Sequence, residues 1–193
     1  DIEKSGSTTA AELLTKLSAN SASLTDGASF SDIAGQRGFN GANLRGIGVS
    51  STLILLNGRR LANFASPGGA SGVDLNAIPS AALERVEVLK DGASAVYGTD
   101  AISGVINFIT RRDYQGAAVY GYTSRTQHGG ADKDIVTLSA GVGDLGKDRF
   151  NVFGVLDYQD TATLRSTQRD WVKGSYQPDI NLDVGSSNTF PAN

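Results

Sequence analysis

The most informative part of this chain is residues 83–107, which read LERVEVLKDGASAVYGTDAISGVIN. Polar and apolar residues alternate over 84–90, which is typical of a strand with one buried face. Small residues follow over 91–98, and a second apolar run, GVINFIT, occupies 104–110. We therefore predict two strands of one sheet, joined by a tight turn whose small residues allow close packing.

The residues upstream predict a helix and a hairpin. Thr9 and Glu12 fit a capping box ahead of three leucines that share one face, so a short helix is expected over residues 9–18. Asn-Gly at 57–58 follows the apolar run at 52–56 and is a strong hairpin signal, because both residues accept the positive φ of a type I′ turn. The hairpin and the two strands are enough for a small mixed sheet.

The second half of the chain repeats one strand pattern three times, over residues 117–127, 135–143 and 149–159. In each repeat, apolar residues alternate with polar or small ones. The apolar positions are Ala118, Tyr120, Tyr122, Val136, Leu138, Ala140, Val142, Phe150, Val152, Leu156 and Tyr158. Strands of this kind form transmembrane β-barrels, and the same alternation also forms soluble antiparallel sheets. The residues alone leave both possibilities open.

Composition excludes several classes of function. The 193 residues contain no Cys and a single His, His128, which excludes disulfides, zinc–cysteine sites and cysteine nucleophiles. The formal net charge of −3 provides no basic excess for nucleic acid. The glycines at 92 and 98 enclose a small-residue turn that lacks the Lys-Ser/Thr of a phosphate-binding loop. We therefore expect no enzyme activity, no metal site, no cofactor and no nucleic-acid partner.

Four motifs, in order and correctly spaced, resemble the plug domain of TonB-dependent outer-membrane receptors. They are NLRGIG at 43–48, LLNGRR at 55–60, DLNAIP at 74–79 and the stretch at 83–107. The resemblance implies an α+β fold in which residues 1–113 form a plug domain with a small mixed sheet and short helices. Antiparallel β-strands over 114–160 are then expected to be the first three strands of a transmembrane β-barrel, truncated here, and 161–193 an exposed loop.

The resemblance also implies a function. Receptors of this family bind a scarce nutrient, such as an iron–siderophore complex, cobalamin or an oligosaccharide, and gate its import through a β-barrel in contact with outer-membrane lipid. The TonB complex of the inner membrane supplies the energy by pulling a segment expected upstream of Asp1. Three strands cannot close a barrel, so we expect this chain to be a fragment of a larger protein in the Gram-negative outer membrane. The alternative is a soluble β-rich ligand-binding module without transport.

Candidate ligand-binding residues come from plug loops that face outward in the family. These residues are Gln36, Arg37, Phe39, Asn40, Ser50, Asn63 and Phe64. Aromatic rings in such loops stack on a ligand, and the polar side chains donate or accept hydrogen bonds. The alternatives are that these are solvated loop residues, and that the two phenylalanines are buried.

A second set of candidates lies in the plug signature and consists of charged residues: Arg45, Glu84, Arg85 and Glu87. The hypothesis is that they form a latch with inward-facing charges of the barrel, through ion pairs that break or shift during transport. Pairs shielded from water would be strong yet severable. The alternative is ordinary ion pairing on a strand face within the plug.

Overall fold

A computed structural model of the chain describes residues 7–21, 39–64, 72–164 and 168, together with the backbone of 176–177 and 182–183. The chain divides into two compact units. The first comprises Asp1–Ala118 and Leu138–Leu156, and the second Val119–Thr137 and Asp157–Asn193. The domain boundary near residue 113 rests on sequence motifs and stays a prediction.

Helix α1 (Ala10–Thr15) begins at the predicted capping residues. Thr9 Oγ1 accepts a hydrogen bond from the Glu12 amide at 3.1 Å, and the Glu12 carboxylate accepts one from the Thr8 amide at 2.8 Å. The helix is shorter than the predicted range of 9–18. It ends early because the Lys16 and Leu17 amides bond to carbonyls only three residues back, which tightens the last turn.

The predicted hairpin is confirmed. Strand β1 (Thr52–Leu56) pairs antiparallel with β2 (Arg59–Arg60), with Leu55 opposite Arg60 and Leu56 opposite Arg59. Asn57 and Gly58 have φ values of 51° and 79°, the left-handed conformations that a type I′ turn requires. The turn therefore sets which β2 side chains share a sheet face with β1.

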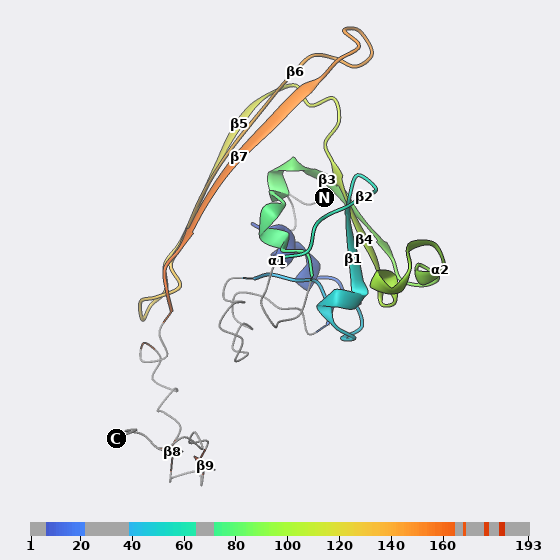
Figure 1. The fold of residues 1–193 in the computed structure, drawn as a ribbon. Coiled ribbons are helices and arrows are strands. Elements are labelled where there is room, and N and C mark those ends of the chain that lie inside the picture. The colour runs from blue at the N-terminus through green and yellow to red at the C-terminus, as the bar shows by residue number, and fades with distance from the viewer. Residues whose placement is uncertain are drawn as a thin grey trace. The chain divides into compact units, whose positions relative to one another are not determined.

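The first unit contains the predicted mixed sheet, in the strand order β2-β1-β4-β3 (Figure 1). Strands β3 (Leu83–Leu89) and β4 (Gly104–Thr110) pair antiparallel, whereas β1 and β4 pair parallel. In the parallel register Thr52 lies opposite Gly104 and Leu56 opposite Phe108. The connection between β3 and β4 contains the short helix α2 (Ser94–Tyr97). Single 3₁₀ turns occupy Val49–Ser51, Leu75–Ala77, Ser80–Ala82 and Thr99–Ala101.

Both faces of this sheet bury apolar side chains, because alternate residues of β1 and β4 point to opposite sides. One face packs against α1 and the 3₁₀ turn at Leu75–Ala77. Its largest buried members include Leu14, Leu44, Ile54, Leu75, Leu83, Ile106 and Phe108. The other face is a smaller cluster of Leu53, Leu55 and Val105 with Ala93 and Ala101 from the β3–β4 connection. The main core therefore lies on the α1 side.

Glycine is required where β4 begins. Gly104 has a φ of +135°, and a Cβ placed there would come within 2.7 Å of the Leu89 carbonyl oxygen and 2.8 Å of a Leu44 methyl carbon. A larger residue would therefore push apart the start of β4, the end of β3 and the loop at residue 44.

Strands β5 (Gly116–Ser124), β6 (Lys133–Val142) and β7 (Val152–Thr161) form a three-stranded sheet in that order. Exposed and less exposed residues alternate along β6, as the sequence predicts for this strand. In β6, Val136 and Leu138 are 48% and 43% exposed, whereas Ile135 is 2% exposed. Two further short strands, β8 (Tyr176–Gln177) and β9 (Leu182–Asp183), pair antiparallel within the range predicted as an exposed loop. Among the described residues, no helix is long and apolar enough to cross a membrane.

Core placement can be tested by truncating Phe108, whose side chain is fully buried between α1 and the sheet. Phe108→Ala should lower the free energy of unfolding by about 3–5 kcal/mol, since it leaves a cavity in a packed core. Val96→Ala is the control, because Val96 is 77% exposed, and should change stability by less than about 0.5 kcal/mol. Urea unfolding followed by circular dichroism measures both, and equal losses would contradict this core.

Candidate functional site

A cavity of about 180 Å³ lies beside the start of β1. Its lining combines apolar side chains with the polar or charged side chains of Ser50, Thr52, Arg60, Asn63 and Asp100. The lining residues are Val49, Ser50, Thr52, Leu53, Ile54, Arg60, Leu61, Asn63, Val73 and Asp100. Two of them, Ser50 and Asn63, are residues that the sequence predicts as ligand contacts, so the structure brings these two predictions into one place.

The hairpin explains why Ser50 and Asn63 meet. Ser50 lies in the 3₁₀ turn that leads into β1, and β2 returns antiparallel after the Asn-Gly turn. The chain beyond β2 therefore comes back toward the residues that precede β1, and it carries Leu61 and Asn63 to the cavity. Both Ser50 and Asn63 are exposed, as a binding residue requires.

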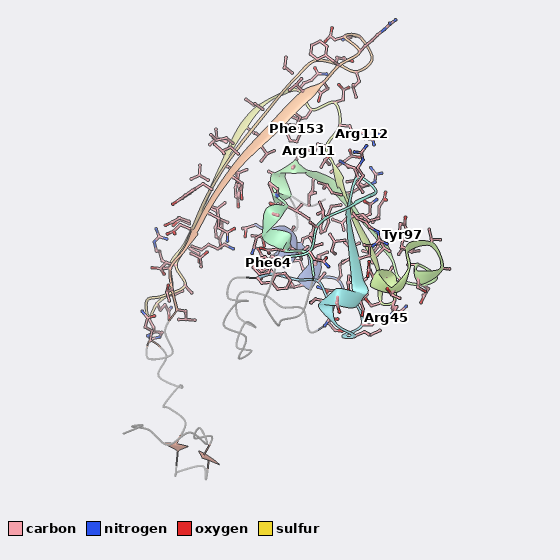
Figure 2. All side chains as sticks on the ribbon, viewed as in Figure 1. Arg45, Phe64, Tyr97, Arg111, Arg112 and Phe153 are labelled. Carbon is pink, nitrogen blue, oxygen red and sulfur yellow. The ribbon has the colours of Figure 1, made fainter. Side chains whose placement is uncertain are left out.

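The charged wall of the cavity is an ion pair that the sequence analysis did not identify. The Arg60 guanidinium pairs with Asp100 at 2.6 Å through Nη1, and Nη2 donates to the main-chain carbonyl of Tyr97. Figure 2 labels Tyr97 on α2. The two side chains are 48% and 59% exposed, so the pair is accessible from solvent. No local signal predicts it, because its partners come from β2 and from the connection between β3 and β4.

The floor of the cavity is fixed by buried hydroxyl groups. Thr52 Oγ1 lies 2.9 Å from Ser103 Oγ, which donates to the Ser51 carbonyl at 2.6 Å. Thr52 Oγ1 also accepts a hydrogen bond from the Leu44 amide at 3.0 Å. A buried hydroxyl group costs free energy unless it is hydrogen-bonded. This arrangement therefore holds the start of β1, the start of β4 and the loop at residue 44 in one geometry.

Phe39, a predicted ligand contact, is buried with 2% of its surface exposed. Its ring packs against that of Phe64, with centroids 5.4 Å apart. The alternative of burial therefore holds for Phe39, and we correct the expectation of an exposed stacking ring. Phe64 is half-buried and keeps a partly accessible face. The physical reason is that a phenylalanine next to a packed core gains more from burial than from exposure.

Asn40 is also turned inward, with 4% of its surface exposed. Its side-chain Nδ2 donates to Asn76 Oδ1 at 2.8 Å. Its main-chain amide donates to Asp74 Oδ1 at 3.2 Å, and its main-chain carbonyl accepts from the Leu75 amide at 2.8 Å. The side chain is therefore buried and joins two loop segments in this structure, and its role as a ligand contact stays a prediction. Gln36 and Arg37 lie outside the described residues, and their roles stay predictions.

The four charged residues predicted as a latch are paired within the first unit. Arg45 has a φ of 61° and forms an ion pair with Asp91, near α2 (Figure 2). On β3, Arg85 Nη1 pairs with Glu84 at 2.8 Å and Nε with Glu87 at 2.9 Å. The hydrogen bond to Glu87 is the main cause that raises the pKa of the Arg85 guanidinium, and the hydrogen bond to Glu84 adds to it. These side chains are about half exposed and accessible to other partners.

The family model described as TonB-dependent Receptor Plug Domain matches residues 1–105. This match covers more than half of the 193 residues, and the chain belongs to that family. The resemblance and the α+β fold class predicted from the sequence are thereby confirmed. The family is one of receptors, not of enzymes.

Three solved structures of receptors are similar to this chain. The siderophore receptor PirA from Acinetobacter baumannii is 31% identical, with a TM-score of 0.52 over 67% of this chain and 20% of that one. PirA from Pseudomonas aeruginosa is 25% identical over 64% of this chain and 22% of that one, with a TM-score of 0.44. A mutant ferric enterobactin receptor PfeA from Pseudomonas aeruginosa, in complex with enterobactin, is 23% identical. The match covers 64% of this chain and 19% of that one, with a TM-score of 0.47.

Of these three structures, only PirA from Acinetobacter baumannii superposes with a TM-score above 0.5. The chain spans about a fifth of the length of the solved receptors that it matches.

The structural role of Asn40 gives a direct test. Asn40→Ala removes the buried donor to Asn76 and should cost about 1–3 kcal/mol of unfolding free energy. Asn63→Ala is the matched control, since Asn63 is exposed, and should stay within about 0.5 kcal/mol of the parent. Thermal and urea unfolding measure the difference. Equal stability of the two variants would show that Asn40 does not hold the loops together.

Proposed function

We propose that this chain is part of a receptor of the Gram-negative outer membrane that binds a scarce nutrient and gates its import through a β-barrel. The observation that carries the proposal is the match of residues 1–105 to the plug domain. A plug has its function inside a barrel, and import against a gradient needs an energy source. The TonB complex of the inner membrane is therefore the proposed energy-supplying partner.

The proposed ligand is an iron–siderophore complex. Of the three ligand classes implied by the sequence, the comparison with PirA from Acinetobacter baumannii favours this one, because that protein is described as a siderophore receptor. Cobalamin and oligosaccharides remain outcomes that a binding assay would distinguish.

Ligand contact is proposed at the cavity beside β1. Ser50 and Asn63 supply exposed hydrogen-bonding groups, and Val49, Leu61 and Val73 supply apolar walls. An engineered cavity of about 150 Å³ holds a benzene molecule, so a space of about 180 Å³ takes one ring-sized group of a ligand and not a whole siderophore. The remainder of the ligand would lie outside the cavity, and Gln36 and Arg37 are proposed as further contacts from the sequence alone.

Contact with outer-membrane lipid is proposed for the alternating apolar side chains of β5, β6 and β7. Leu138, Val152 and Leu156, all from the alternating apolar set, are 43%, 63% and 67% exposed. Exposed apolar residues at every second position favour hydrocarbon over water as their surroundings. Tyr120, Tyr122 and Tyr158 are exposed on the same strands, as expected of aromatic residues at a membrane interface.

A latch between plug and barrel is proposed for Arg45, Glu84, Arg85 and Glu87. Support comes from their accessibility and from the weakness of ion pairs that are exposed to water. Such pairs exchange partners at little cost. Burial of the same charges inside a barrel would strengthen any ion pair that they form with its wall.

Transport is tested in cells that produce the full protein containing this chain. Radiolabelled ferric siderophore should enter wild-type cells only while the inner membrane is energised. Asn63→Ala should weaken binding about tenfold, the effect of one lost hydrogen bond of about 1.4 kcal/mol, without lowering the amount of receptor. Recovery of the protein in the soluble fraction, with binding but no uptake, would contradict transport and support a soluble binding module.

The latch is tested by charge reversal. Arg45→Glu should strongly reduce uptake, because it repels Asp91 and any acidic barrel partner. The double variant Arg45→Glu with Asp91→Arg restores attraction inside the plug but not toward the barrel. Uptake should therefore stay low in the double variant. Full recovery would mean that Arg45 acts only through Asp91.

A further inference from the structure

The charges that line the cavity cancel each other. Asp100 Oδ2 lies 2.6 Å from Arg60 Nη1, and Arg60 Nη2 is bonded to the Tyr97 carbonyl. Two of the three guanidinium nitrogens are thus engaged by oxygen atoms of the protein. A ligand group in the cavity meets a positive and a negative charge side by side.

This arrangement disfavours a carboxylate or phosphate group. An anion that approached Arg60 would also approach Asp100, and it would have to displace that carboxylate to gain the same bond. Arginine without an acidic partner would instead be a strong and geometrically suitable anion receptor. Asp100 therefore changes what Arg60 can recognise.

The remaining polar groups suit a neutral ligand group. The Ser50 hydroxyl both donates and accepts hydrogen bonds, and so does the Asn63 side-chain amide. The apolar walls formed by Val49, Leu61 and Val73 favour an uncharged group that does not carry a tightly held hydration shell. A carboxamide or hydroxyl group offers the donors and acceptors that these side chains can satisfy.

We propose that Asp100 determines specificity at this cavity: by neutralising Arg60, it makes the cavity accept a neutral carboxamide or hydroxyl group of the ligand and reject a carboxylate. The inference rests on the proposed function, in which the ligand contacts this cavity. It assigns to Asp100 a role in selection and not in catalysis or folding.

The test uses acetamide and acetate, which have nearly the same shape and differ in charge. Methyl groups of Val49, Leu61 and Val73 line the cavity, so methyl NMR of the full chain, labelled at valine and leucine, reports binding. Wild-type protein should show saturable shifts with acetamide and at least tenfold weaker binding of acetate. This comparison needs no variant, so it decides the proposal even if a substitution prevents folding.

Asp100→Asn should strengthen acetate binding at least tenfold and reduce the preference for acetamide over acetate. The matched control is Asp134→Asn, which removes the same charge from another exposed Arg–Asp pair that does not line the cavity. The control should keep the wild-type preference for acetamide.

Three results would overturn the proposal: acetate binding the wild type as tightly as acetamide, no gain of acetate binding in Asp100→Asn, or an equal gain in Asp134→Asn. Absence of shifts with both probes would also overturn it, because the cavity would then bind neither class. None of these results bears on transport, which is measured separately by siderophore uptake. A failed uptake assay with the acetamide preference intact would reject transport and retain the specificity of the cavity.

Discussion

The parallel pairing of β1 with β4 is the constraint on which the plug unit depends. Thr52 lies opposite Gly104 and Leu56 opposite Phe108, so residues far apart in the sequence share one ladder. Each of the two core clusters takes side chains from both strands. A slip of one residue would exchange the faces of a strand and bury its wrong side chains. The buried hydroxyls of Thr52 and Ser103 oppose such a slip at the start of the ladder.

The cavity follows from this pairing and from the hairpin. The pairing fixes the start of β1 beside the connection that carries Asp100, and the Asn-Gly turn returns Arg60 to the same region. The ion pair between these two residues then closes one wall of the cavity. The lining of the cavity is thus assembled from four segments of chain, at residues 49–54, 60–63, 73 and 100. The site is a product of topology and not of a local sequence signal.

The side chains predicted for the site divide according to their surroundings. Ser50 and Asn63 face the cavity because both lie just outside the strands, where backbone and side chains reach solvent. Phe39 and Asn40 are adjacent to the core and are buried. A loop rich in asparagine and glycine indicates irregular structure, but it does not show which side chains are ligands and which hold the loop. In this loop the Asn40 side chain has the second role, through its hydrogen bond to Asn76.

By itself, the sequence determined the family, the start of α1, the hairpin and the strands of the two larger sheets, whereas α2, β8 and β9 were not predicted. The capping pair at Thr9 and Glu12, the Asn-Gly turn and the strand alternation are local signals, because each depends on dihedral preferences or side-chain periodicity within a few residues. The tertiary structure alone decided that Arg60 pairs with Asp100, that Arg45 pairs with Asp91 and that Phe39 is buried. Those outcomes depend on which distant segments are brought together, and side-chain burial and charge pairing are settled only after that packing is in place.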